Sequence, residues 1–485
     1  MAPSKVFYMN DRASSLAEST PFKALKLCRD IGIDKIIKPG DKVAVKMHMG
    51  EYGNSLNLRP QWVSVITKEI QRLGAFPTVV DDTTVTTGDY SGRATRADHL
   101  RVASSHGFNE ETLGCPVEIC DGEYGMDDVE VEVPNGVLLK HCWMGKKFTE
   151  FDKLVVISHF KGHSQGVYGG AIKNMGIGMG SKRGKVGTHM YPHPVWGIPN
   201  AKIDQERFKE CTNAVGVKRL PTGNVLVPKT SPEQSTIVDR YLASCPWGYL
   251  KKSEDGYLEW DKENCNNCNF CWQCAGQFAG IWKLHPDLPS LWPVTIADSA
   301  SAYVNYFGKE NCLFINYAFD ITPICDCAQF HDRPMIPNLG VFVSRDPVAV
   351  DMACLEACEA SAIVPGSKAE DFGFADPNTD RFTNCSSALH ISQWNQINAG
   401  VWNGMGNSEY ELIESVPGPD TDYWLEPYTE KNTFYMQMNK HWVDTPFEYD
   451  KYWYDEMRAS HDYLWTRPKG IVGEMSIAEY NEKNK

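Results

Sequence analysis

Short apolar strands alternate with amphipathic helices in the first part of this chain, and this alternation restricts its fold more than any other feature. Segments 5–9 and 42–48 predict strands, and apolar residues recur at helical spacing over 21–32. A second helix is predicted over 61–74 and a short buried strand over 77–82. Because this alternation is typical of parallel sheets, we predict an α/β fold of mostly parallel sheets covered by helices.

The alternation returns later in the chain. Strands are predicted over 152–160 and 312–320. The segment 339–358 predicts a strand, a turn and a helix, with Asp346 as the N-cap and Pro347 in the first helical turn. The later part of the chain therefore predicts a second α/β unit.

The length of 485 residues is too great for one simple core, so we expect several parts. The composition also changes along the chain, because Trp, Tyr, Asn and Glu become frequent after Trp394. Disordered tails are poor in aromatic residues, so we expect this last part to wrap the body or to contact a partner. The predicted parts are a first α/β unit (1–190), an excursion with a small cysteine-rich insert (191–285), a second α/β unit (286–385) and an aromatic-rich C-terminal extension (386–485).

Charge and cysteine content restrict the partners and the compartment. The formal net charge is −14, so neither nucleic acid nor an anionic membrane surface is an expected partner. No stretch approaches the ~20 apolar residues of a membrane span, and the N-terminus lacks the apolar region of a secretory signal. Sixteen cysteines in such a chain predict reduced thiols with a metal or redox site. We therefore expect a cytoplasmic protein in an oxygen-poor setting.

The run CNNCNFCWQC spaces its cysteines three residues apart, at Cys265, Cys268, Cys271 and Cys274. Iron–sulfur clusters take thiolates from such loops, and the usual bacterial run is C-x2-C-x2-C-x3-C-P. The first three cysteines match that run, whereas Cys274 comes one residue early and is followed by Ala275. We predict one [4Fe–4S] cluster, because a second tandem run is absent from the sequence.

A remote cysteine is the alternative fourth ligand. Cys325 and Cys327 follow a predicted strand, and if that strand continues, its two-residue period places both on one face about 7 Å apart. Zinc is the rival metal, but structural zinc sites favour two cysteine pairs separated by a longer stretch. The crowded run therefore favours an iron–sulfur cluster.

A loop rich in glycine and basic residues follows the strand LVVIS and runs from Ser158 to Met190. In open α/β sheets ligands bind beyond the carboxyl ends of strands, and glycines let amide groups approach an anion. The loop fits neither a Walker A loop nor a dinucleotide fingerprint, and a solvated basic loop is the alternative. We predict that its catalytic residues, as proton carriers, anion anchors or covalent tethers, are His159, His163, Lys173 and His189.

Cations from this loop and from two others are the predicted binding groups for a small anionic substrate. Lys46 and His48 share one face of the strand 42–48, and Arg93 follows the strand 77–82. We expect these loops to converge at one edge of the sheet. The predicted substrate-binding residues are Lys46, His48, Arg93, Lys161, Lys182 and Lys185.

Several of these motifs together resemble a known family. VAVKMHMGE, RATRADH, HFKGHSQGVYGGAIKNMGIGMGSKRGK and ICDCAQFHDRPMIPNLGVFVSRDPVAVDMAC are similar to the iron–sulfur-binding proteins of domain-of-unknown-function family 362, over roughly residues 1–360. The resemblance implies a ferredoxin-like insert where Cys265 to Cys274 lie, although the early fourth cysteine departs from that insert. A looser likeness links His163, Lys173 and His189 to nickel-pincer lactate racemases, and it implies a lysine-tethered cofactor with histidines as nickel ligand and proton carriers. The spacing G-G-A-I-K differs from that family.

These features favour an iron–sulfur redox enzyme or electron-transfer subunit that handles a small anionic substrate or cofactor. A non-redox racemase or lyase with a metal or a tethered cofactor is one alternative. A cluster-carrying assembly or binding protein is the other. We expect an electron-transfer protein or a larger complex as partner, and a homo-oligomer or a complex subunit as the assembly state.

Overall fold

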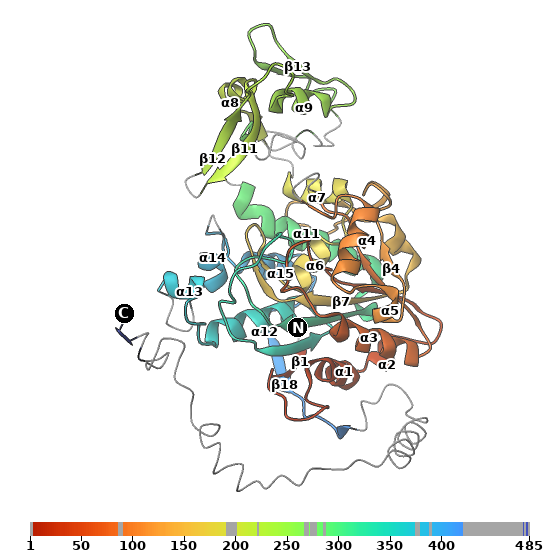
Figure 1. Ribbon diagram of the computed structural model, residues 1–485. Helices are drawn as coiled ribbons and strands as arrows, with labels where there is room; N and C mark the ends of the chain where they lie inside the picture. Colours follow the sequence, from red (N-terminus) through yellow and green to blue (C-terminus); the bar gives the residue numbers. More distant parts are fainter. Residues whose placement is uncertain are drawn as a thin grey trace, which may run out of the picture. The chain divides into compact units, whose positions relative to one another are not determined.

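Figure 1 shows a computed structural model of the chain. It describes residues 3–85, 91–190, 201–220, 223–265, 271, 279–284, 288–373, 379–387, 390–420, 479 and 482–483. The chain divides into one compact unit, Met1–Leu425, and a second unit, Glu426–Lys485. Of the predicted aromatic-rich extension, most residues beyond 420 lie outside the described part.

One eight-stranded sheet forms the centre of the first unit, in the order β18-β1-β17-β16-β7-β2-β3-β4. Neighbouring strands run parallel except at β17, which is antiparallel to both β1 and β16. The predicted α/β fold with a mostly parallel sheet is confirmed. In sheet order the strands are β18 (Tyr410–Glu414), β1 (Ser4–Met9), β17 (Gly340–Ser344), β16 (Cys312–Ala318), β7 (Lys153–His159), β2 (Lys42–Lys46), β3 (Phe76–Asp81) and β4 (Val117–Ile119).

Strands from both predicted α/β units belong to this one sheet. β16 from the later part of the chain lies beside β7 from the earlier part, with Ile315 opposite Ile157. β17 then separates β16 from the N-terminal strand β1. The two parts of the chain therefore share one sheet and its two hydrophobic faces.

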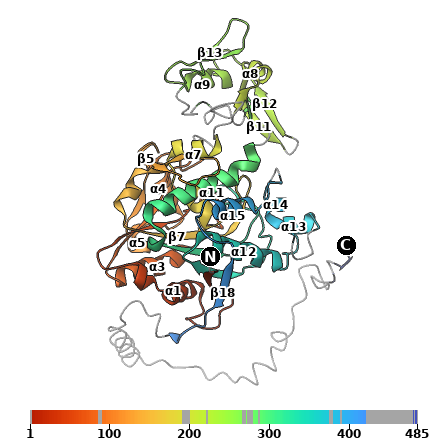
Figure 2. The ribbon, with the colours of Figure 1, turned by 180° about the vertical axis from the view of Figure 1, so that it is seen from behind.

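Helices cover both faces of the sheet, as Figures 1 and 2 show from opposite sides. Successive strand residues point to opposite faces, so Val43 and Val45 of β2 join one buried cluster and Ala44 joins the other. Each fully buried Val, Leu or Ile side chain stabilises the fold by roughly 1.5–3 kcal/mol. The first face packs against α1 (Thr20–Asp30), α2 (Ile33–Ile36), α3 (Pro60–Arg72), α4 (Arg96–Ser105) and α5 (Glu110–Leu113). The second packs against α6 (Ala171–Gly176), α7 (Lys182–His189), α11 (Leu288–Phe307), α12 (Pro347–Ala360), α13 (Lys368–Asp371), α14 (Arg381–Cys385) and α15 (Asn395–Trp402).

The N-terminus of α6 receives a carboxylate from α12. Asp351 accepts hydrogen bonds from the amides of Ala171 (2.7 Å) and Ile172 (3.0 Å), and from the Asn316 side chain (2.7 Å). Gly170 makes this approach possible, because a Cβ there would lie 2.4 Å from Asp351 Oδ1. The motifs GGAIKN and DPVAVD, distant in sequence, therefore hold each other in place.

The predicted start of α12 is confirmed. Asp346 is its N-cap and accepts hydrogen bonds from the amides of Val348 (2.9 Å) and Ala349 (3.1 Å), while Pro347 occupies the first turn. The same carboxylate accepts a hydrogen bond from Ser4 Oγ (2.7 Å). The cap of α12 thus also ties down the N-terminal strand β1.

The cysteine run belongs to an insertion between α7 and α11. Its first and last described strands, β10 (Ala201–Ile203) and β15 (Trp282–Leu284), pair with each other, so the insertion begins and ends at neighbouring points. Cys265 and Cys271 are partly buried, and Tyr241 lies beside Cys271. Cys268 and Cys274 lie outside the described residues. Between its end strands the insertion contains α8 (Gln205–Cys211), β11 (Ala214–Leu220), β12 (Gly223–Pro228), α9 (Ile237–Ala243), β13 (Leu250–Lys252) and β14 (Leu258–Trp260).

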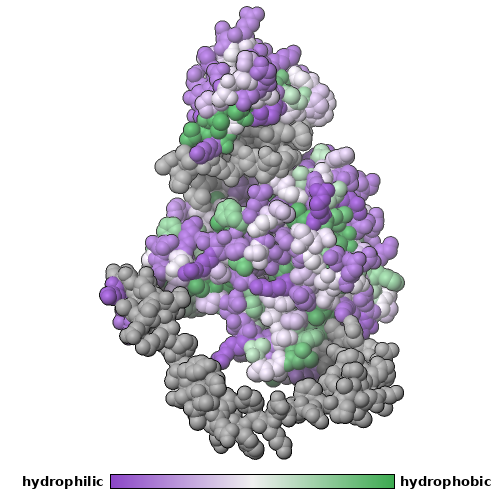
Figure 3. Space-filling model, in the orientation of Figure 1, coloured by the Kyte–Doolittle hydropathy of each residue, from purple (hydrophilic) through white to green (hydrophobic). Residues whose placement is uncertain are grey.

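Small hairpins and short helices complete the described structure. They are β5 (Asp128–Glu132) with β6 (His141–Gly145), β8 (Lys161–His163) with β9 (Val167–Gly169), and the 3-10 helices η2 (Lys146–Glu150) and η4 (Lys309–Asn311). The face in Figure 3 is mostly hydrophilic, with hydrophobic residues in small separate groups. Within the described part of the chain, no helix combines the length and apolar character needed to cross a membrane.

Candidate functional site

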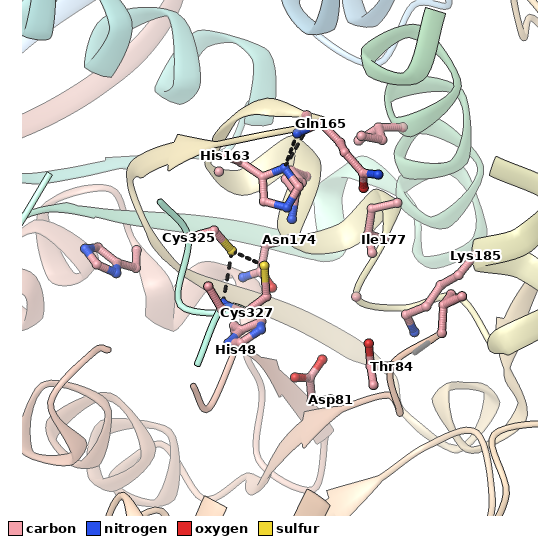
Figure 4. A pocket seen from close by; sticks show the side chains of 18 of the residues that line it. His48, Asp81, Thr84, His163, Gln165, Asn174, Ile177, Lys185, Cys325 and Cys327 are labelled. Atoms are coloured by element: carbon pink, nitrogen blue, oxygen red, sulfur yellow. Dashed lines mark hydrogen bonds between the residues drawn. The ribbon is translucent and has the colours of Figure 1, made fainter. Parts of the chain in front are cut away.

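A cavity of about 370 Å³ lies at the carboxyl ends of β2, β3 and β7 and beside the loop that follows β16 (Figure 4). The loops that the sequence predicted to converge at one sheet edge do meet here. Of the predicted catalytic and substrate-binding residues, Lys182 does not line the cavity. The predicted residues that line it are Lys46, His48, Arg93, His159, Lys161, His163, Lys173, Lys185, His189, Cys325 and Cys327.

Cys325 and Cys327 lie in a tight turn, so the condition of a continuing strand, under which both would share one face, is not met. The Ala328 amide donates to the Cys325 carbonyl (3.0 Å), which closes the turn. The two sulfurs then lie 2.7 Å apart, and the Cys327 amide donates to Cys325 Sγ (3.2 Å). Pro at position 323 cannot donate an amide to a continuing strand ladder, which favours this departure. Both sulfurs face the cavity (Figure 4).

Asp326 holds this turn in place. Its carboxylate accepts hydrogen bonds from His159 Nδ1 (2.8 Å) and Lys161 Nζ (3.2 Å), and all three side chains are buried. His159 Nε2 donates to the Phe319 carbonyl (2.7 Å). Burial alone would raise the pKa of Asp326, but the charges of His159 and Lys161 outweigh it and hold the pKa well below its ordinary value. His159 and Lys161 are therefore engaged in positioning the cysteine turn.

His163 is held in one tautomer by the main chain. Its Nδ1 accepts hydrogen bonds from the amides of Gln165 (3.1 Å) and Gly166 (2.8 Å), so Nδ1 carries no proton. Burial, followed by the charge of Lys173, lowers the pKa of His163, which favours the neutral ring. The proton of the neutral ring is thus on Nε2, and the ring contacts the Cys325 sulfur.

These three side chains also form a group that could hold a metal ion. The ligand atoms of His163, Cys325 and Cys327 all lie within 4.8 Å of one another. Thiolate and imidazole suit a soft divalent metal such as zinc. However, a metal on His163 Nε2 would leave the remaining proton to Nδ1, which faces two amide donors. Among the described residues, neither Cys265 nor Cys271 belongs to this group.

Lys46 is neutralised within the site. Its ammonium lies 3.0 Å from Asp81 Oδ1 and donates to Asn174 Oδ1 (2.7 Å), with both charged groups buried. The absence of a side chain at Gly178 leaves room for the Lys46 ammonium group, because a Cβ at this glycine would lie too close to Lys46 Nζ. Burial lowers the pKa of Lys46, and the charge of Asp81 opposes that shift. At the cavity wall, the charge of Lys46 is therefore paired with that of Asp81.

His48 presents an unpaired donor to the cavity. Its Nδ1 accepts a hydrogen bond from the Gly50 amide (2.9 Å), which leaves the proton of the neutral ring on Nε2. His48 Nε2 is buried and has no hydrogen-bond partner within the described part of the chain. Burial, reinforced by the charge of Arg93, lowers the pKa of His48 to about 3. A ligand acceptor would satisfy this N–H group.

Arg93 lines the cavity and forms an ion pair with the buried carboxylate of Glu51. Its Nε donates to Glu51 Oε2 (2.9 Å), and Glu51 also accepts from Ser91 Oγ (2.7 Å) and the Gly92 amide (2.8 Å). Burial opposes the charge of Arg93, but Glu51 outweighs that effect and raises the pKa of the guanidinium. Its positive charge is thus fixed at the cavity wall.

His189 and Lys185 line the far side of the cavity, and Lys182 lies outside its lining. His189 Nδ1 donates to the Lys185 carbonyl (2.6 Å), and burial lowers the pKa of His189 to about 4, so Nε2 is an acceptor. The Lys185 side chain donates to the Gly180 carbonyl. Lys182 instead donates to Thr83 Oγ1 (3.0 Å), and burial lowers its pKa to about 8.

The structure adds residues that the sequence-based site did not include. Asp326 positions the cysteine turn, and Asn174 positions Lys46. Asp82 lines the cavity, and neither of its carboxylate oxygens is hydrogen-bonded among the described residues. Burial raises the pKa of Asp82, and the neighbouring Asp121 adds to the shift. The Asp between two cysteines in C-D-C was the one sequence signal for Asp326.

The expectation that glycines in the loop cradle an external anion needs revision at α6. The amides at its N-terminus, those of Ala171 and Ile172, already bind the carboxylate of Asp351. The positive groups that face the cavity are therefore side chains and not main-chain amides. Lys173, which belongs to α6, is one of them.

Comparison with protein families places the chain in one of them. Residues 43–356 match the model of the family described as "Domain of unknown function (DUF362)". No curated protein matches the chain in sequence. Because the match spans more than half of the sequence, this protein belongs to that family.

Proposed function

We propose that this protein is a redox enzyme that carries one [4Fe–4S] cluster and handles a small anionic substrate in the cavity at the sheet edge. The observation that carries the proposal is the cavity itself, in which two cysteine sulfurs and a histidine lie among the cations of Lys173, Lys185 and Arg93. Such a site favours an anion that undergoes redox or covalent chemistry.

The residues around the cavity have different roles in the proposed binding of the substrate. Lys173, Lys185 and Arg93 supply positive charge for the anionic group, and His48 Nε2–H supplies a hydrogen-bond donor. His189 Nε2 offers a buried acceptor for a proton. Burial of Arg93 and Lys185 strengthens the electrostatic interactions that these two side chains can make.

The cysteine run supports the cluster. Cys265, Cys268 and Cys271 have the spacing of a bacterial iron–sulfur run, and Cys274 is the next candidate. A bound cluster would supply single-electron transfer. An electron-transfer protein or a larger complex would be the partner in this proposal, and the compartment would be a reducing cytoplasm.

Iron and acid-labile sulfide analysis after anaerobic purification tests the proposal. We expect about four iron and four sulfide per chain in the wild type and near zero in Cys268→Ala. Cys245→Ala, which changes a partly exposed cysteine outside the run, is the matched control and should keep the wild-type content. Zinc without sulfide, or unchanged iron in Cys268→Ala, would contradict the cluster assignment.

A non-redox racemase or lyase is the second candidate, because Lys173, His163 and His189 line the same cavity. His163 presents an N–H group there and His189 an acceptor nitrogen, an arrangement suited to moving one proton between two bases. Nickel in the purified protein, or a covalent adduct on Lys173 in the intact mass, would favour this candidate. Neither is expected for the redox enzyme.

A further inference from the structure

The turn that holds Cys325 and Cys327 presents two sulfurs to a cavity that is lined by several cations. We propose that these cysteines form a redox-active dithiol that exchanges with a small anionic disulfide bound in that cavity. The inference takes the substrate cavity of the proposed function as its binding site, but it does not require the iron–sulfur cluster.

The two sulfurs are adjacent, and the turn that holds them is fixed. The sulfurs lie 2.7 Å apart on a two-residue step, and the anchored Asp326 between them points away toward His159 and Lys161. Because three buried charged groups fix the turn, the two sulfurs stay adjacent in both the reduced and the disulfide forms. Formation of an intramolecular disulfide therefore needs little movement of the backbone.

The surroundings of the two cysteines differ, and this difference indicates which sulfur attacks the substrate. His163 contacts Cys325, and its two hydrogen bonds from main-chain amides keep the ring proton on Nε2, where it can be donated to a thiolate. The Cys325 sulfur also lies 2.7 Å from the Cys327 sulfur, so the two thiols are adjacent. Because His163 contacts Cys325, we assign Cys325 as the nucleophile and Cys327 as the thiol that resolves the mixed disulfide.

Two cations near the sulfurs can bind an anionic substrate. The Lys173 side chain has no hydrogen bond or ion pair among the described residues, and its charge acts on both Cys325 and Cys327. The charge of Arg93 also reaches Cys327. These two cations would hold the carboxylate or similar anionic group of a substrate whose reacting bond lies over the sulfurs.

The exchange balances without a further reagent. The Cys325 thiolate attacks one sulfur of the substrate disulfide, so a mixed disulfide forms, the substrate S–S bond breaks, and one half leaves as a thiolate. Cys327 then attacks Cys325 and releases the second half, which takes the Cys327 proton. The protein pair loses two electrons and the substrate disulfide gains them.

The test uses the reduced full-length protein and dithiobis-nitrobenzoate, an anionic aromatic disulfide, as the probe. After reaction, free thiols are alkylated with iodoacetamide in denaturant, and peptides are mapped by mass spectrometry without reduction. We expect the segment with Cys325 and Cys327 to be two hydrogens lighter and free of alkylation at both. In Cys327→Ser the thionitrobenzoate adduct should remain on Cys325. In Cys325→Ser the reaction should slow on the order of ten-fold or more.

Cys245→Ser is the matched control, because Cys245 is partly exposed and does not line the cavity. It should react at this segment like the wild type. The proposal is overturned if both cysteines remain fully alkylated after treatment, or if Cys325→Ser and the wild type react equally. It is also overturned if the pair reacts only after a chelator removes a bound metal ion, which would make it a metal site.

The inference and the proposed function can fail separately. Cys268→Ala should lose its iron but keep the exchange at Cys325 and Cys327. Full iron content with an unreactive pair would overturn the dithiol alone. A reactive pair in a protein without iron would overturn the cluster alone.

Discussion

At the scale of single residues, Lys173 is the cation whose role can be separated most cleanly. Lys173→Gln should slow the reaction of Cys325 with dithiobis-nitrobenzoate on the order of ten-fold, because it removes the charge that attracts the anion. The reaction with an uncharged hydroxyethyl disulfide should change less. The ratio of the two rates, measured by stopped-flow absorbance and by mass mapping, reports substrate charge selection.

Lys26→Gln is the control for a general charge effect. Lys26 forms a partly exposed ion pair with Asp30 one helical turn away and does not line the cavity. Both rates should stay at their wild-type values in this variant. Equal slowing of the anionic and the uncharged disulfide in Lys173→Gln would show that Lys173 acts on thiol reactivity and not on the substrate.

The sequence identified the lysines, the arginine, the histidines and the cysteines that line the cavity, but it did not show how they interact. His163, Lys173 and Cys325 stand out by residue type and by their position after predicted strands. The tautomers of His163 and His48 depend on amides of nearby turns, and the lock on the cysteine turn depends on Asp326 meeting His159 across the fold. Such contacts arise from tertiary distances, which residue spacing does not contain.

At the scale of elements, the junction between α6 and α12 carries the geometry of the site. Gly170→Ala would place a methyl group 2.4 Å from Asp351 Oδ1, so the carboxylate or the start of α6 must move. We expect a loss of roughly 1–3 kcal/mol in the free energy of unfolding, typical of overpacking in a closed core. Urea unfolding followed by circular dichroism measures it.

Gly216→Ala is the matched control, because a Cβ at Gly216 would meet no heavy atom within 4 Å. It should change the free energy of unfolding by less than about 0.5 kcal/mol. Equal stability of Gly170→Ala and the wild type would show that the contact with Asp351 does not hold α6 in place.

Local signals explain which elements the sequence predicted well. The N-cap Asp346 and Pro347 mark the start of α12, and the run of apolar residues marks β7, because both signals lie within a few residues. The sequence left open whether the cysteine segment continues the strand, and in the structure this segment turns. Its conformation depends on the buried charges around Asp326, which are remote in sequence.

At the scale of the whole molecule, the sequence predicted the fold class, and pairing across the chain determined how its parts combine. In the sheet, β16 and β17 lie between β7 and β1, so residues that are far apart in the chain pair with each other. Neither periodicity nor turn chemistry reports such pairing. The sequence could therefore predict two α/β units without revealing that both contribute to one sheet.

We expect that the insertion can be removed, because β10 and β15 at its two ends pair with each other. Replacing residues 205–280 with a short Gly/Ser linker should keep the sheet, because Ile203 pairs with Trp282 at the base of the insertion. We expect the melting temperature to fall by less than about 5 °C, equivalent to roughly 1–2 kcal/mol. The dithiol exchange should persist and the iron should be lost. An insoluble product, or one that lacks a cooperative transition, would show that the body needs the insertion to fold.

The measurement that tests the central claim most directly is the EPR spectrum of the anaerobically purified protein after reduction with dithionite. The proposed enzyme should show the signal of one reduced [4Fe–4S] cluster, and that signal should be absent from Cys268→Ala. A protein that shows no such signal and contains zinc without sulfide would contradict the claim. The cysteine run would then be a structural metal site.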